Sequence, residues 1–157
     1  MPTPSASEQD TRRIASGLAA VSPALHRALD RRLAQDFPHP KLPEGQLALL
    51  RLVGERDGIT VRKAADTLLM KPNNMSALVT QLAGLELLER RQDGDDKRVA
   101  HLHLTAEARD RIAMVGDLMD GYVLEALHTL TEGERGAIGS ALGALQTLTQ
   151  HIHPAAD

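Results

Sequence analysis

Residues 87–105 read LLERRQDGDDKRVAHLHLT, two strand-like segments on either side of a polar turn. The turn sequence Asp-Gly-Asp-Asp at 93–96 is typical of a hairpin tip. After the turn, apolar side chains occupy every second position, which is the pattern of a strand with one buried face. These alternating residues are Ala100, Leu102 and Leu104. The stretch therefore predicts a β-hairpin with strands near 87–91 and 98–104.

Three short helices are predicted ahead of this hairpin. They span residues 44–57, 61–70 and 73–85. Gly58 is expected to end the first helix, Thr60 caps the second and Pro72 suits the first turn of the third. Apolar residues recur at spacings of three and four, which gives each helix one inward face. The inward residues are Leu47, Leu50, Val53, Ala64, Ala65, Leu68, Met75, Leu78, Val79 and Leu82. Two short helices across a tight turn, followed by a hairpin, predict a mainly α fold with a winged helix-turn-helix.

Long helices with single apolar stripes are predicted on both sides of this module, which spans residues 44–105. The N-terminal helix covers 7–37, with Ser7 as the expected N-cap. Pro23 lies inside it and predicts either a kink or a later start at Ser22.

Two further helices are predicted over residues 106–153. Thr105 caps the first of them, and Thr131 with Glu134 forms a capping box for the second. The stripes on the flanking helices are too long for the small module to cover alone, so a second copy of the chain is the simplest partner. The residues expected at this homodimer interface are Ile14, Leu18, Val21, Leu25, Met119, Tyr122, Leu127, Ile138, Leu142, Leu145, Leu148 and Ile152.

The composition narrows the function. The 157 residues suit one domain and include one Phe, one Tyr and no Trp, which favours helix packing and disfavours the aromatic stacking used to bind single-stranded nucleic acids. There is no cysteine, which excludes disulfides and a thiol nucleophile. The first residues do not read as a signal peptide, and no apolar run approaches the roughly 20 residues of a membrane span. A cytoplasmic protein without a membrane partner is expected.

The stretch from Ile59 to Thr105 resembles the MarR (multiple antibiotic resistance regulator) family of winged helix-turn-helix transcription regulators. The hallmark is in the wing, where Asp96 and Arg98 are followed six residues later by Leu104 and Thr105. The long helices on either side match the dimerisation region of the family, so the resemblance covers nearly the whole chain. It implies a homodimeric regulator, most often a repressor, that binds a pseudo-palindromic DNA site. It also implies release by a small aromatic or phenolic effector, although no ligand site can be assigned from the residues.

A helix that enters the major groove needs a slim outer face that can form hydrogen bonds. The outer face predicted at the third short helix is small and uncharged and comprises Asn73, Asn74, Ser76, Ala77, Thr80 and Gln81. The helix N-terminus near Pro72 is expected to favour a phosphate. Arg98 is expected to enter the minor groove, with Lys97 on a phosphate. The resemblance implies that Asp96 orients this Arg98 side chain. Backbone contacts are further expected from Thr60, Arg62, Lys63, Lys71 and Arg90.

The charge distribution leaves a second interpretation open. The net charge is −3, and over residues 60–109 eight cations stand against seven acidic residues. Ala77 and Gln81 occupy positions where the family frequently carries Arg, Lys71 replaces a common Ser or Thr cap, and Leu85-Glu86 replaces a residue-Gly turn. The alternative is therefore a winged-helix module that binds another protein and no longer reads DNA.

Enzymatic activity is not expected, because the sequence contains no Gly-rich phosphate loop, nucleophile elbow or metalloprotease motif. No cofactor is expected either. His101 and His103 share one face of a strand and could begin a zinc site. A convincing third and fourth ligand is missing from the sequence, so no metal site is predicted.

Overall fold

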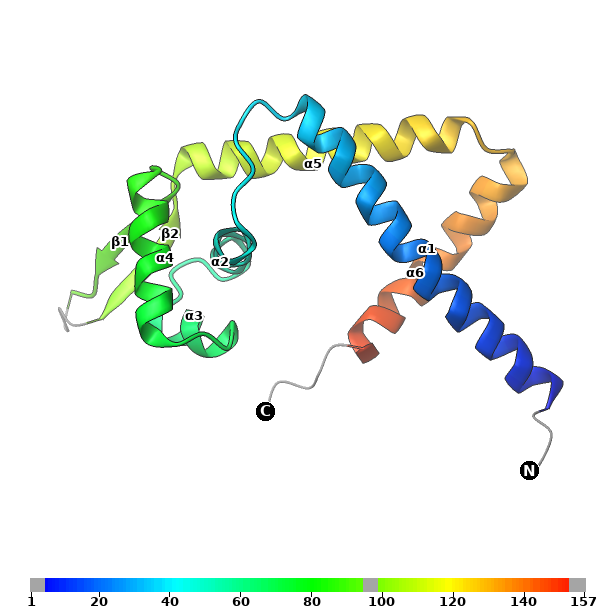
Figure 1. The fold of residues 1–157 in the computed structure, drawn as a ribbon, viewed down its shortest axis with the longest axis horizontal. Coiled ribbons are helices and arrows are strands. Elements are labelled where there is room, and N and C mark those ends of the chain that lie inside the picture. The colour runs from blue at the N-terminus through cyan, green and yellow to red at the C-terminus, as the bar shows by residue number, and fades with distance from the viewer. Residues whose placement is uncertain (1–4, 95–98, 153–157) are drawn as a thin grey trace. The chain divides into compact units, whose positions relative to one another are not determined.

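Six helices and one two-stranded antiparallel sheet make up the computed structural model, which describes residues 5–94 and 99–152 (Figure 1). In chain order they are α1 (Ala6–Asp36), α2 (Glu44–Glu55), α3 (Val61–Thr67), α4 (Pro72–Gly84), β1 (Leu88–Gln92), β2 (Ala100–Leu104), α5 (Ala106–His128) and α6 (Glu132–Ile152). The chain divides into two units, Met1–Leu118 and Met119–Asp157. The fold class predicted from the sequence, mainly α with one hairpin, is confirmed.

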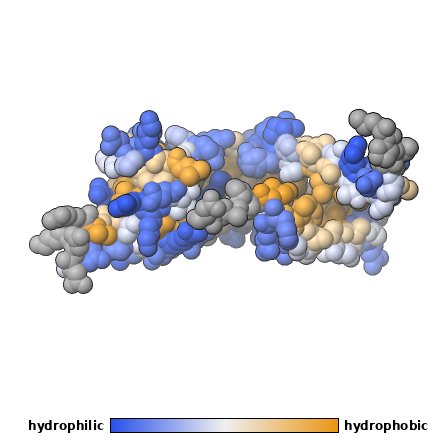
Figure 2. Space-filling view, turned by 90° about the horizontal axis from the view of Figure 1, so that it is seen from below, coloured by the Kyte–Doolittle hydropathy of each residue, from blue (hydrophilic) through white to orange (hydrophobic). Residues whose placement is uncertain are grey.

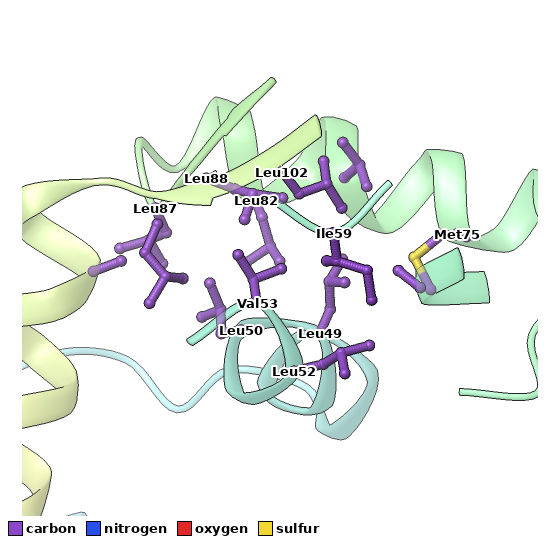
Figure 3. Packing of buried hydrophobic residues seen from close by; sticks show 14 of the residues in the cluster. Leu49, Leu50, Leu52, Val53, Ile59, Met75, Leu82, Leu87, Leu88 and Leu102 are labelled. Carbon is purple, nitrogen blue, oxygen red and sulfur yellow. The ribbon is translucent and has the colours of Figure 1, made fainter. Parts of the chain in front are cut away.

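The core lies where α2, α3, α4 and the hairpin meet (Figure 3). The fully buried side chains that fill it are Leu49, Val53, Met75, Val79, Leu82, Leu87 and Leu102. Of the inward face predicted for α4, Met75, Val79 and Leu82 are buried, and Leu78 is half-buried against the core. On α2 the prediction was partly wrong, because Leu49 and Leu52 are buried whereas Leu47 is only half-buried. The helix packs against both α4 and β2, so it buries a wider face than a single stripe.

Side-chain caps fix where most of the helices begin. Thr60 accepts a hydrogen bond from the backbone N of Lys63 at 3.2 Å, as predicted. The Thr105 hydroxyl likewise accepts from the backbone N of Ala108 at 3.0 Å. Thr131 and Glu134 form the expected reciprocal pair at the start of α6. The hydroxyl and then the backbone N of Thr131 donate to the Glu134 carboxylate, which lowers the pKa of Glu134 below its ordinary value.

The start of α1 differs from the prediction. Ser5, and not Ser7, is the N-cap, with its hydroxyl 3.3 Å from the backbone N of Glu8 and the Glu8 carboxylate 2.8 Å from the backbone N of Ser5. Ser7 is followed at the third position by Asp10, whose shorter side chain does not supply the Glu or Gln of a capping box. The helix then continues through Pro23, so the alternative start at Ser22 is wrong.

Among residues 5–94 and 99–152, two residues other than glycine adopt a left-handed backbone conformation, just after α3 and α4. The sequence predicts that α3 ends at Met70, but the helix ends at Thr67, because Leu69 has φ 52°. Leu68, predicted to face inward, is half-buried. Glu86 has φ 59° in the turn before the hairpin. A residue with a Cβ atom pays roughly 1 kcal/mol or more for this conformation. Glu86 therefore adopts the left-handed conformation at the turn where the family resemblance places a glycine.

The hairpin is bonded on both edges of β2. The strands pair from Leu88 with Leu104 to Gln92 with Ala100, so β2 begins at Ala100 and not at Arg98, a residue outside the described part of the chain. On its other edge, the backbone N of Leu102 donates to the carbonyl of Ile59 and the backbone N of Gly58 donates to the carbonyl of Leu102, both at 2.9 Å. The loop between α2 and α3 therefore acts as a short third strand.

Replacing Gly58 by alanine is expected to destabilise the protein by about 1–2 kcal/mol. Gly58 has φ 78°, a conformation that L-residues rarely adopt, and an added Cβ atom would lie 3.5 Å from Cε1 of His103. The comparison is made by urea denaturation at a fixed protein concentration. Replacing Gly94, where an added Cβ atom meets nothing within 4 Å and the φ is not left-handed, is the control. Equal free energies of unfolding for the wild type and Gly58→Ala would contradict this prediction.

The apolar residues of the flanking helices α1 and α6 are largely exposed to solvent. No residue of α1 or α6, both of which lie within the described ranges, is buried. Apolar side chains reach the surface among hydrophilic ones on the face drawn in Figure 2. None of the helices in the described part of the chain combines the length and apolar character that a membrane span needs.

Candidate nucleic-acid interface

The outer face of α4 is the most regular polar surface of the module. Met75, Val79 and Leu82 anchor the helix in the core. The opposite side exposes Pro72 together with the six residues that the sequence predicts there, namely Asn73, Asn74, Ser76, Ala77, Thr80 and Gln81. None of these seven carries a charge, and their amides and hydroxyls can both donate and accept hydrogen bonds. A helix anchored on one side and narrow on the other can enter a groove roughly 12 Å wide.

The N-terminus of α4 is open to an anion. Lys71 occupies the N-cap position and makes no side-chain cap hydrogen bond, and Pro72 follows it in the first turn. The first N–H groups of a helix have no partner within the helix, and the macrodipole makes this end electropositive. With the exposed Lys71 ammonium beside it, this end suits a phosphate.

Gln81 is held by a buried residue that the sequence analysis did not single out. Nε2 of Gln46 donates to Oε1 of Gln81 at 3.0 Å, and Gln46 is only 7% exposed on α2. Oε1 of Gln46 is buried without a hydrogen-bond partner in the described part of the chain. Because the Gln81 oxygen already accepts one hydrogen bond, its amide NH₂ is the group left to donate outward. The available signal was the spacing of Gln46 from Leu49 and Val53, which places a polar residue on an inward face.

The start of α3 contributes cations beside α4. Arg62 and Lys63 are exposed in its first turn, whereas Thr60 is half-buried and its hydroxyl is occupied as the N-cap. Thr60 also pairs with His101 as an isolated bridge to β2. The structure therefore gives Thr60 a capping role and leaves Arg62 and Lys63 as the residues that can reach a phosphate.

Further charged groups lie on the two strands of the hairpin. Arg90 and Arg91 are exposed on β1, and Arg91 forms an ion pair with Glu89 at 2.8 Å. On the facing strand, the ring of His101 lies between the carbonyl of Gly58 at 2.8 Å and the carboxylate of Asp93 at 3.0 Å. The three expected wing contacts, Asp96, Lys97 and Arg98, lie outside the described residues, so their placement remains a prediction.

The histidines of β2 do not gather into a metal site. Nδ1 of His103 is 3.0 Å from the carboxylate of Asp57, and both ring nitrogens of His101 are engaged with other partners. Within residues 5–94 and 99–152, no three His, Asp or Glu side chains come together as a set that could hold a metal ion. The polar pairs of this strand instead link the hairpin to the loop before α3.

The arrangement of α2, α3, α4 and the hairpin defines a winged helix-turn-helix module. Residues 42–100 match the model of the MarR family, the family that the resemblance in the sequence had indicated. No curated protein matches the sequence.

Solved structures share this fold over most of the chain. A protein of Pseudomonas aeruginosa PA01 is 25% identical, with a TM-score of 0.75 and coverage of 94% of this chain and 99% of that one. RV1404 from Mycobacterium tuberculosis is 21% identical, with a TM-score of 0.73 and coverage of 94% and 96%. FabT from Streptococcus pneumoniae, solved in complex with DNA, is 17% identical, with a TM-score of 0.64 and coverage of 90% and 99%. The flanking helices therefore belong to the shared fold together with the module.

Proposed function

We propose that the protein is a sequence-specific regulator of transcription that binds duplex DNA as a homodimer. The observation that carries the proposal is the outer face of α4, whose seven exposed residues are slim and uncharged while its inner face is locked in the core. Asn73, Asn74 and Gln81 would read base edges in the major groove, and Ser76 and Thr80 would contact bases or phosphates. FabT, which has the same fold, was solved with DNA.

The backbone contacts of the proposed complex come from three places. Lys71 and the open N-terminus of α4 would hold one phosphate, and the exposed Arg62 and Lys63 of α3 would hold a neighbouring one. Arg90 would contact the backbone from the hairpin. Arg98 would enter the minor groove with Asp96 as its orienting partner, and Lys97 would reach a phosphate.

Dimerisation is proposed through the flanking helices. The exposed large apolar residues on described α1 are Ile14, Leu18, Val21 and Leu25, and those on α6 are Ile138, Leu142, Leu145, Leu148 and Ile152. These are the residues that the sequence places in the two stripes. On α5 the match is weaker, since Tyr122 is buried in the single chain, Met119 and Leu127 are half-buried, and Val123 and Leu124 are exposed instead. A second chain would cover the stripes of α1 and α6 and bring two α4 helices to successive half-sites.

The proposal further includes a pseudo-palindromic operator, repression as the mode of action and release by a small aromatic or phenolic effector. It includes no catalytic step, cofactor or membrane partner. It places the protein in the cytoplasm, where its DNA partner would lie.

Arg98→Ala is expected to weaken operator binding by about tenfold, because a minor-groove arginine contact contributes roughly 1–3 kcal/mol. The operator is first selected from random duplexes with the purified protein, and affinity is then measured by gel shift in 100 mM salt. Arg13→Ala removes the same charge from α1, far from α4 in the sequence, and serves as the control. Equal affinities for the wild type and Arg98→Ala would remove the wing from the proposed interface.

A module that binds a protein instead of DNA is the second candidate, favoured by the near-neutral charge of residues 60–109. The two candidates differ in their salt dependence. A DNA-binding protein retains affinity for random duplexes in dilute buffer and loses it steeply as salt rises. Absence of binding to any duplex at low salt would favour the protein partner.

A further inference from the structure

His101 lies between two groups that can only accept hydrogen bonds. Its Nδ1 is 2.8 Å from the backbone carbonyl oxygen of Gly58, and its Nε2 is 3.0 Å from Oδ2 of Asp93. A carbonyl oxygen has no proton to give, and neither has an ionised carboxylate. Both ring nitrogens must therefore donate, which only the protonated imidazolium can do.

The two partners of His101 belong to different parts of the fold. Asp93 directly follows β1 where the hairpin enters its turn, and Gly58 lies in the loop that leads into α3. The side chain of His101 is 31% exposed, so it is partly shielded while remaining able to exchange protons with solvent. Through this one ring, the residue that leads into the wing tip is tied to the loop before the α3 cations.

The charged groups around His101 favour its protonation on balance. The carbonyl of Gly58 and then the carboxylate of Asp93 raise the pKa of His101 above its ordinary value, whereas partial burial and, more weakly, the ammonium of Lys63 on α3 oppose this. Arg91 faces His101 across the hairpin but is paired with Glu89 at 2.8 Å.

The next residue on the same face of β2 provides a contrast. His103 uses Nδ1 toward the carboxylate of Asp57 at 3.0 Å. One donated hydrogen bond can be made by a neutral imidazole as well as by a charged one. His103 therefore does not require the doubly protonated form that the surroundings of His101 demand.

We propose that His101 is a positioning residue for DNA binding, whose imidazolium holds the turn end of the hairpin against the loop before α3 and releases one partner when it loses its proton. The inference rests on the proposed function and adds a regulation of the same interface. Backbone hydrogen bonds between Leu102 and residues 58–59 keep β2 in place in both states. Deprotonation therefore changes how Asp93 is held after β1, without breaking these backbone hydrogen bonds.

The direction of the pH effect follows from the raised pKa. A group whose pKa is raised in the folded state stabilises that state below the unfolded pKa and loses this effect as the pH rises through the folded pKa. The link is thus fully present at a pH below the ordinary pKa of histidine, and it is lost as the pH rises through the raised pKa of His101 in the folded protein. One linked proton changes the affinity by at most about tenfold per pH unit.

The test measures operator affinity between pH 6 and pH 8.5 at constant ionic strength, by fluorescence anisotropy, for the full-length protein. Wild-type affinity is expected to fall by about tenfold over this range. His101→Gln cannot donate from both ends, so its affinity is expected to stay near the high-pH value of the wild type throughout. His103→Gln, the matched control on the same face of β2, is expected to keep the wild-type profile.

A second measurement does not depend on DNA or on a variant that folds. The ¹⁵N shifts of the His101 ring in the free wild-type protein report whether both nitrogens carry a proton, and both are expected to be protonated at pH 6. A single protonated nitrogen there, or equal pH profiles for the wild type and His101→Gln, would overturn the role of His101. Failure of the wild type to bind DNA at any pH would instead overturn the proposed function.

Discussion

The double variant Leu142→Asp, Leu145→Asp is expected to be monomeric at micromolar concentration and to bind the operator at least a hundredfold more weakly than the wild type. Both side chains are exposed in the apolar stripe of α6, at 54% and 37%. In the proposed dimer each aspartate would bury an unpaired charge, which costs far more than the apolar contact it replaces. Separated subunits also lose the gain of about 10²–10⁴ that comes from engaging two half-sites at once.

Analytical ultracentrifugation measures the association, and gel shift measures the operator affinity. Ser140→Asp, Thr147→Asp places the same charges on the opposite face of α6, where both residues are exposed. This control is expected to remain dimeric. A dimeric Leu142→Asp, Leu145→Asp variant with unchanged affinity would show that the stripe of α6 is not the interface.

Leu82→Ala is expected to lower the free energy of unfolding by about 3–5 kcal/mol. Leu82 is fully buried on the inner face of α4 and packs in the core between α2 and the hairpin (Figure 3). Truncation removes its apolar contacts and leaves a cavity in the layer that supports α4. Urea denaturation at a fixed protein concentration measures the loss, since association also contributes to stability.

Thr80→Ala is the matched control for the outer face of the same helix. Thr80 is exposed, and its hydroxyl donates only to the carbonyl of Ser76 in the preceding turn, at 2.9 Å. The free energy of unfolding of Thr80→Ala is expected to differ from that of the wild type by less than about 0.5 kcal/mol, while its affinity for the operator falls. Loss of stability in Thr80→Ala, or none in Leu82→Ala, would contradict the division of α4 into a supporting and a reading face.

Local patterns in the sequence predicted the order of the elements and most of their ends. Thr60, Thr105 and Thr131 each cap a helix because a hydroxyl stands directly before an apolar periodic segment. The sequence analysis named Ser7 as the N-cap of α1, whereas the structure uses Ser5. The two serines differ only in the residue three positions later, which is Glu8 after Ser5 and Asp10 after Ser7. The end of α3 was missed because Leu69 adopts a left-handed conformation that its side chain disfavours.

The candidate interface was predictable on α4 and less so elsewhere. On α4, one period separates the inner from the outer residues, so the exposed set follows once the helix is assigned. The bond between Gln46 and Gln81 joins residues 35 positions apart, and the link from His101 to Gly58 spans 43. Such contacts form only when the elements pack together, so the local spacing of residues in the sequence does not predict them.

All buried and half-buried residues of the hydrophobic core lie between Leu42 and Ala108, so the core is complete well before the end of the sequence. During synthesis, a module that contains all of these residues can fold as soon as they have left the ribosome, before α6 has emerged. In the proposed dimer, joining two chains is then a separate bimolecular event between preformed modules. Its extent depends on protein concentration, so the abundance of the protein in the cell would itself set how much of it is competent to bind an operator.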